Sequence, residues 1–157
     1  GAVPVLVGWA AVRNDVTWTP VVLFAVIFLW TPPHFWALAI RYADDYRAAN
    51  VPMLPAVVEA TVAVRSMVTY TALMAATTLA LAPVADLGPI YVVSAVLLGL
   101  LFLWGTVDLG RNPTPQRSMR VFAYSITYIT LLFGAMMVDV FARNSCASIS
   151  ATTVACG

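Results

Sequence analysis

The sequence predicts an all-α integral membrane protein, a polytopic bundle of transmembrane helices, from its composition and from the spacing of its charges. Hydrophobic residues make up 62% of the 157 residues and charged residues 10%. The mean hydropathy of +0.90 is far above that of ordinary soluble domains. Crossing the hydrocarbon core of a bilayer takes roughly 20 apolar residues. Four uncharged stretches come close to that length: residues 16–40, 66–85, 87–107 and 121–138.

These stretches set the expected organisation of the chain. Residues 1–144 are expected to form one membrane domain, and residues 145–157 a Ser/Thr/Ala-rich tail that we expect to be disordered. The tail carries Cys146 and Cys156, which are too few and too local to indicate a metal cluster. The expected spans lie at about residues 18–40, 66–84, 90–107 and 121–140.

The residues ahead of the first span, 1–12 (GAVPVLVGWAAV), resemble the second half of a membrane helix that ends in a polar turn at 13–15. They lack the basic region of a signal peptide and begin with glycine rather than methionine. We therefore expect the chain to be a fragment of a longer protein.

Proline and glycine mark the irregular points of the spans. Pro32 and Pro33 follow Thr31 inside the first span, where the missing backbone donors predict a kinked or discontinuous helix. Carbonyls freed at membrane depth are tolerated only where protein or a wet cavity receives them, so the proline pair favours a functional cavity. Pro83 and Gly88-Pro89 predict a tight turn between the second and third spans.

The arginines predict the orientation of the chain. Six of the eight lie in two loops, residues 41–65 and 108–120, which two spans separate and which must therefore share one face. The positive-inside rule makes that face cytoplasmic, so we expect a multi-pass protein of the cell membrane. The net charge of +1 gives no sign of a surface for nucleic acid.

The polar residues of the first loop adjoin the only histidine of the chain, His34. We expect the first part of this loop to continue the helix until Pro52 and Pro55 break it. If residues 37–48 are helical, Arg41 and Asp45 are i and i+4 and lie on one stripe with His34 and Leu38. His34 would then lie about 10 Å deeper in the membrane than Arg41. This predicts a pocket with carboxylates at its cytoplasmic mouth and an imidazole further in.

Asp44 and Asp45 are the only adjacent carboxylates in the sequence. With nearby arginines they suit a Mg²⁺–diphosphate group, because Mg²⁺ prefers oxygen ligands and arginine clamps phosphate oxygens. The alternative is a pair of ordinary surface ion pairs, Arg41–Asp45 and Asp44–Arg47, each contributing a few tenths of a kcal/mol. His34 is either a structural group bonded to the backbone or a functional one, such as a ligand to a tetrapyrrole iron.

Several aromatic residues are weaker candidates. Tyr124 and Tyr128 share a face of the last span near Ser125, where they line the same cavity or form an interfacial tyrosine pair. Trp30 is either a residue of the aromatic belt or one of the core. The arginines of residues 108–120 are better explained as topology determinants than as ligands.

The segment WTPPHFWALAIRYADDYRAANVPMLP, residues 30–55, resembles the signature region of the protoheme IX farnesyltransferases, a branch of the UbiA-type membrane prenyltransferases. GAVPVLVGWAAV resembles the glycine-rich segment that precedes it in the same family. The resemblance implies a UbiA-type fold, nine transmembrane helices around a central cavity, of which this chain would supply the last four and part of the fifth. It also implies farnesyl transfer from farnesyl diphosphate to a vinyl group of heme B, giving heme O and diphosphate, with Mg²⁺ as cofactor and heme A synthase as a possible partner.

The resemblance assigns roles to residues by their place in the motif. Asp44 and Asp45 would bind the metal and, with Arg41, form the catalytic group, while His34 matches the histidine of the PHF motif and becomes a candidate for heme binding. The full substrate-binding set is His34, Arg47, Tyr46, Trp30, Tyr124 and Tyr128.

The chain departs from the superfamily pattern in two places. A first acidic motif of the N-D-x-x-D type is absent, since Asn14-Asp15 is followed by Trp18 where the second aspartate belongs. The second motif lacks its last acid, with Ala49 four residues after Asp45, which is typical of the heme branch. We therefore expect these residues alone to be inactive. The alternatives are a prenyltransferase for an aromatic quinone precursor and a non-catalytic heme-binding membrane subunit.

Overall fold

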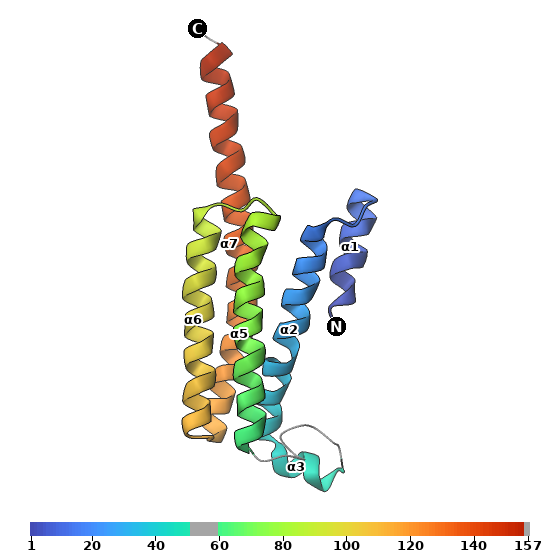
Figure 1. Ribbon diagram of the computed structural model, residues 1–157, viewed down its shortest axis with the longest axis vertical. Helices are drawn as coiled ribbons and strands as arrows, with labels where there is room; N and C mark the ends of the chain where they lie inside the picture. The colour runs from blue at the N-terminus through green and yellow to red at the C-terminus, as the bar shows by residue number, and fades with distance from the viewer. Residues whose placement is uncertain (51–59, 156–157) are drawn as a thin grey trace.

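The computed structural model describes residues 1–50 and 60–155, and within these ranges it is helical with no strand. This confirms the all-α prediction. The long helices lie side by side, with a short helix near the N-terminus and another at one end of the bundle (Figure 1). The helices are α1 (Val3–Arg13), α2 (Trp18–Arg41), α3 (Ala43–Ala48), α5 (Ala60–Val84), α6 (Pro89–Arg111) and α7 (Pro115–Ala155).

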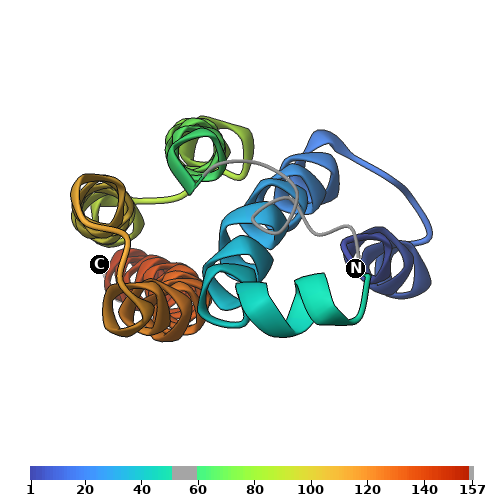
Figure 2. The same cartoon turned by 90° about the horizontal axis from the view of Figure 1, so that it is seen from below.

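The four long helices pack in a ring, α2 against α5, α5 against α6, α6 against α7, and α7 back against α2 (Figure 2). Their facing sides form the core, because an apolar helix in this arrangement buries one stripe and leaves the rest for its surroundings. The largest fully buried side chains of this core are Tyr91, Tyr128, Phe102, Met67 and Met74.

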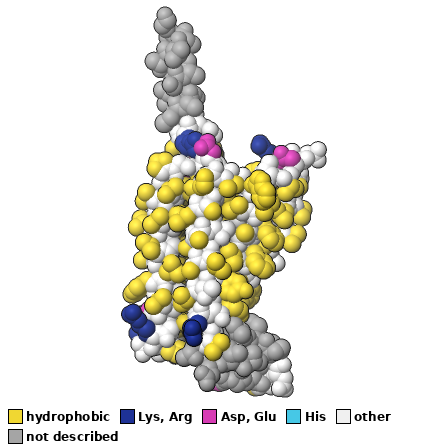
Figure 3. Space-filling model, viewed as in Figure 1, with side chains coloured by type: hydrophobic (Ala, Val, Ile, Leu, Met, Phe, Trp, Pro, Cys, Tyr) yellow, Lys and Arg dark blue, Asp and Glu magenta, His cyan; other side chains and the backbone are white. Residues whose placement is uncertain are grey.

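All four predicted spans are present among the described residues, as helices that are long and apolar enough to cross a membrane. Apolar side chains cover the middle of the bundle, and charged side chains gather at its two ends (Figure 3). The helices run longer than the predicted spans, with α5 beginning at Ala60 and α6 ending at Arg111. A helix need not stop where the hydrocarbon core ends, so hydropathy predicts the span better than the helix.

The last helix reaches into the Ser/Thr/Ala-rich tail at residues 145–157. Among the described residues α7 continues as a helix through Ala155, and the disorder expected for the tail stays a prediction. The stretch from Ser145 to Ala155 contains neither glycine nor proline, and without these residues nothing local ends a helix. The last two residues lie outside the described ranges.

The proline pair does not interrupt α2, which is one helix from Trp18 to Arg41 with both prolines inside it. Of the two forms predicted for this span, a kinked helix and a discontinuous one, the discontinuous helix is therefore not observed. Thr31 donates its hydroxyl proton to the Ile27 carbonyl at 2.8 Å, one turn before the pair. Pro33 is buried, so this part of α2 faces protein. Backbone carbonyls that lose their helical partner at membrane depth are tolerated in such a position.

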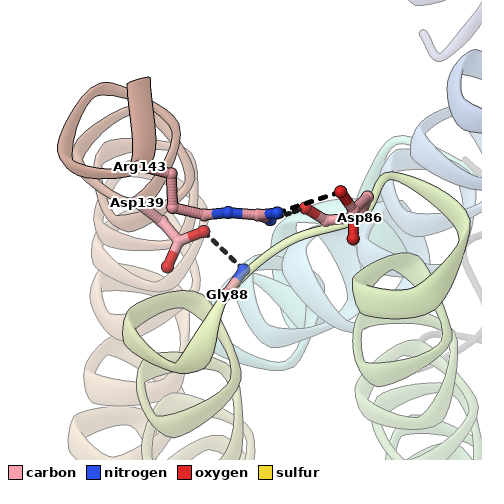
Figure 4. A network of polar contacts seen from close by, with 4 residues as sticks. All are labelled: Asp86, Gly88, Asp139 and Arg143. Atoms are coloured by element: carbon pink, nitrogen blue, oxygen red, sulfur yellow. Dashed lines mark hydrogen bonds and ion pairs between the residues drawn. The ribbon is translucent and has the colours of Figure 1, made fainter. Parts of the chain in front are cut away.

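The turn between α5 and α6 is tied to α7 by a network of polar contacts (Figure 4). Asp139, only 1% exposed, accepts the backbone N–H of Gly88 at 2.5 Å. Arg143 forms an ion pair with Asp86 at 2.9 Å and also donates to its backbone carbonyl. Gly88 allows this close approach, because a Cβ at this position would lie 2.8 Å from the Asp139 carboxylate.

Candidate functional site

His34 lies in the contact between α2 and α7, with aromatic rings on both of its faces. Its ring stacks on Trp30 with centroids 4.3 Å apart and on Phe122 at 4.6 Å. Trp30 and His34 are one turn apart on α2, so their side chains share a face. The side chain is only partly buried, so the imidazole is held firmly but remains accessible.

Ser125 of α7 forms hydrogen bonds with the side chains of both His34 and Trp30. His34 Nδ1 is 2.6 Å from the Ser125 hydroxyl, and Trp30 donates its indole N–H to the Ser125 carbonyl at 2.8 Å. The same hydroxyl donates to the Phe122 carbonyl at 2.6 Å. Two turns earlier on α7, buried Ser118 donates to the Ala37 carbonyl of α2. Two serines seven residues apart therefore connect the two helices.

The acidic pair does not continue the stripe that carries His34. The predicted helix over residues 37–48 is wrong, because α2 ends at Arg41, Tyr42 leaves helical geometry and α3 starts a new direction at Ala43. Figure 2 shows α3 lying across the end of α2. The charges favour this break, since a cation stabilises the C-terminus of one helix and anions the N-terminus of the next.

Arg41 is consequently not the ion-pair partner that its spacing predicts. In the described part of the chain no ion pair joins it to Asp45, and its guanidinium lies over the Tyr42 ring, 5.4 Å from the centroid. Asp44 and Asp45 are both exposed, in the first turn of α3. Sequence neighbours on a helix point about 100° apart, so the two carboxylates diverge. Because residues 34–41 are helical, His34 is still about 10 Å along α2 from Arg41.

Other candidates fall in different places. Tyr128 is fully buried in the bundle core, where its hydroxyl pairs with Thr78 at 3.0 Å. Tyr124 faces α6 and donates to the Leu98 carbonyl at 3.2 Å. Neither tyrosine joins the His34 cluster. The side chains of Tyr46 and Arg47 lie outside the described residues, as do Pro52 and Pro55.

The arginines of the second loop have structural partners or lie at the surface. Arg117 forms an ion pair with Asp108 at 3.2 Å and donates to its backbone carbonyl. Arg117 and exposed Arg120 also border a cavity of about 250 Å³ between α6 and α7, with Trp104 and Tyr124 in its apolar wall. These contacts give Arg117 a structural partner, and the role of the loop's arginines as topology determinants stays a prediction.

Comparison with known proteins shows the family. The family model described as the UbiA prenyltransferase family matches residues 1–146. The chain belongs to the UbiA prenyltransferase family. No solved structure matches it.

Three curated relatives of this UbiA chain share one name. It is 52% identical to a protoheme IX farnesyltransferase of Frankia alni over 141 residues, which are 88% of this chain and 49% of that protein. The protein of the same name from Pseudarthrobacter chlorophenolicus is 48% identical over 146 residues, 90% of this chain and 46% of that protein. The protein of the same name from Gloeobacter violaceus is 46% identical over 140 residues, which are 88% of this chain and 46% of that protein. The chain spans about half the length of these curated relatives.

The residues of α3 fit part of a divalent-cation site of the kind that this family uses for diphosphate substrates. Exposed carboxylate oxygens are the ligands that Mg²⁺ prefers, and Mg²⁺ needs one or two of them when water and phosphate supply the rest. Among the described side chains no three of His, Cys, Asp or Glu come together. The UbiA chain can thus supply one side of such a site.

Sequence reasoning missed Ser125 and Phe122 as partners of His34. Ser118, Phe122 and Ser125 follow one another at spacings of four and three, which places them on one face of a helix. That pattern could have indicated a contact face on α7. It could not have indicated which helix the face meets.

Proposed function

We propose that the complete protein transfers a farnesyl group from farnesyl diphosphate to heme B, giving heme O and diphosphate. The observation that carries the proposal is the partly buried His34 imidazole, clamped between aromatic rings about 10 Å along α2 from the segment that bears the acids. An imidazole suits heme iron, and carboxylates suit a metal–diphosphate group. The shared name of the relatives supports the same reaction.

The reaction forms one carbon–carbon bond. The C–O bond to diphosphate breaks, and diphosphate leaves with the electron pair. The terminal vinyl carbon of heme B bonds to the farnesyl carbon, water adds to the other vinyl carbon, and a proton is released. The developing allylic cation requires a site that excludes other water.

His34 would hold heme B at the iron, so that a vinyl group faces the farnesyl chain. Trp30 and Phe122, which stack on His34, would form an apolar wall beside the porphyrin. The binding energy of this wall would orient the vinyl group rather than act on the diphosphate.

Asp44 and Asp45 would hold Mg²⁺ at the diphosphate, with Arg41 and Arg47 on the phosphate oxygens. Bound there, Mg²⁺ would neutralise the charge that develops on the leaving group. Both carboxylates lie in the first turn of α3, from which they would supply oxygen ligands. The remaining ligands would come from the part of the protein outside this chain.

The same proposal places the protein in the cell membrane, with residues 41–65 and 108–120 on the cytoplasmic side. The described residues of both segments lie at one end of the bundle, the lower end in Figure 1, and the two segments together hold six of the eight arginines. An enzyme that oxidises heme O, such as heme A synthase, is the expected partner.

The complete protein in membranes, supplied with labelled farnesyl diphosphate and Mg²⁺, tests the function. Heme B and an aromatic quinone precursor are offered separately, and the products are separated by chromatography. We expect label in a heme of increased hydrophobicity and none in the quinone precursor. Label in the quinone precursor alone would contradict the proposal, and heme binding without any transfer would make the protein a heme-binding subunit.

A further inference from the structure

We propose that Ser125 is a positioning residue that keeps the proton of the His34 imidazole on Nδ1 and leaves the Nε2 lone pair for a ligand. In the proposed function that ligand is the iron of heme B, and only this last step rests on the proposed function. The assignment of the proton rests on the contacts around Ser125.

The proton count decides the tautomer. A serine hydroxyl has one proton, and that of Ser125 is donated to the Phe122 carbonyl at 2.6 Å. Its oxygen is also 2.6 Å from His34 Nδ1, so the proton between these two atoms must come from the imidazole. If Ser125 donated to Nδ1 instead, its oxygen would face the Phe122 carbonyl oxygen at 2.6 Å with no proton between them. The neutral ring then has its free lone pair on Nε2.

The surroundings also hold the ring in one orientation. Trp30 and Phe122 stack on opposite faces, with interplanar angles of 20° and 24°. Trp30 is fixed in turn by its bond to the Ser125 carbonyl. If the imidazole rotated by half a turn, its Nδ1 would point away from Ser125 and the hydrogen bond between them would be lost. Ser125 therefore fixes both the tautomer and the position of Nε2, the arrangement by which outer partners orient a metal-binding histidine.

Ser118 provides a control that distinguishes a positioning role of Ser125 from a packing role. It lies on the same face of α7, is buried and also links α7 to α2, but its partner is the Ala37 carbonyl. Removing its hydroxyl deletes a contact between the helices without touching the imidazole. Ser118→Ala is thus the matched control for Ser125→Ala, and Ser125→Thr retains the hydroxyl.

The test is ¹⁵N NMR of the complete, heme-free protein in detergent, labelled at histidine, with His34→Gln used to assign the resonance. We expect His34 as the Nδ1–H tautomer in the unmodified protein, in Ser118→Ala and in Ser125→Thr. Ser125→Ala should convert a large share of it to the Nε2–H form. A proton on Nε2 in the unmodified protein would overturn the proposal whether or not any variant folds. An unchanged tautomer in Ser125→Ala would also overturn it.

Optical titration of the same proteins with heme adds the functional readout. Loss of an outer partner of a metal-binding histidine typically weakens metal affinity about 10- to 100-fold. We expect this loss for Ser125→Ala and near-normal affinity for Ser118→Ala and Ser125→Thr. Equal losses in Ser118→Ala and Ser125→Ala would reduce Ser125 to a packing role. If the tautomer responds as stated but the unmodified protein binds no heme, the proposed function fails and the positioning role of Ser125 stands.

Discussion

Asp139 at one end of the bundle and the pair Asp44 and Asp45 at the other differ in burial and in role. At the turn between α5 and α6, Asp139 is 1% exposed, and its oxygens accept the backbone N–H groups of Gly88 at 2.5 Å and Tyr91 at 3.4 Å. At the other end, Asp44 and Asp45 are exposed on α3. The first carboxylate completes the fold, whereas the other two face outward, where a cation can reach them.

The physical reason is the cost of removing a carboxylate from water. A buried carboxylate must be hydrogen-bonded to be tolerated, and Asp139 meets this condition with backbone donors at the start of α6. An exposed carboxylate keeps its hydration and can exchange water for a cation. Substitutions at the two ends should therefore affect different properties of the protein.

The largest effect is expected for Asp45→Asn in the complete protein. Loss of one electrostatic group at a developing charge typically lowers the rate about 100-fold or more, so heme O should fall by at least that factor. Stability should change by less than about 0.5 kcal/mol, as for other surface substitutions. Chromatography of extracted hemes and thermal unfolding in detergent measure the two quantities. Asp15→Asn, an exposed aspartate outside the site, is the control, and near-normal heme O from Asp45→Asn would remove its assigned role.

Asp139→Ala should have the reverse profile. It leaves the N–H groups of Gly88 and Tyr91 without their acceptor, and an unsatisfied buried polar group costs about 1–3 kcal/mol. We expect the free energy of unfolding, measured with denaturant, to fall by this amount. Heme O formation per folded molecule should stay within about twofold of normal, because Asp139 lies at the end of the bundle opposite Asp44 and Asp45. Asp139→Asn keeps one acceptor and should lose less. A normal unfolding midpoint for Asp139→Ala would show that the network of Figure 4 does not stabilise the fold.

Gly88→Ala should destabilise the same turn more mildly. Its Cβ would lie 2.8 Å from one Asp139 oxygen and 3.1 Å from the other, and overpacking typically costs about 1–3 kcal/mol. The lower part of this range is expected, because a side chain can shift. The double variant with Asp139→Ala should lose less than the sum of the single losses, since the clash disappears with the carboxylate. Strict additivity in the unfolding experiment would contradict the close approach.

Arg143→Ala should have the smallest effect. The Asp86 side chain that it pairs with is 92% exposed, and such ion pairs contribute up to about 1 kcal/mol. Added salt should reduce the difference from the unmodified protein in unfolding experiments. A loss as large as that of Asp139→Ala would place the stabilisation of the turn in the ion pair rather than in the buried carboxylate.

The fold was largely predictable because the bilayer imposes a length on each span. Uncharged stretches therefore predicted α2, α5, α6 and α7, and Gly88-Pro89 predicted the turn. The break at Tyr42 was missed because no glycine or proline stands there. The order of the charges favours it, with Arg41 in the last turn of one helix and Asp44 in the first turn of the next. The continuation of α7 to Ala155 was not predicted, because composition measures polarity, not helix termination.

The site was predictable in its residue types but not in its contacts. His34 was conspicuous as the only histidine, inside an apolar run. Its partner Ser125 is 91 residues away, and no local pattern specifies a contact between distant helices. Asp139 was overlooked for the same reason, since at the end of an apolar stretch it looks like an ordinary span boundary. Tyr128 was assigned to the site because it shares a face of the last span with Tyr124, yet it lies in the core against Thr78.

Heme titration of the complete protein and of its His34→Gln variant, in detergent, tests the central claim that the α2–α7 contact presents an imidazole to heme. We predict an absorption spectrum typical of imidazole-ligated heme for the unmodified protein. The variant should lose that spectrum and bind heme at least about tenfold more weakly. Asp45→Asn should retain both the spectrum and the affinity. An unchanged spectrum and affinity in His34→Gln would contradict the account.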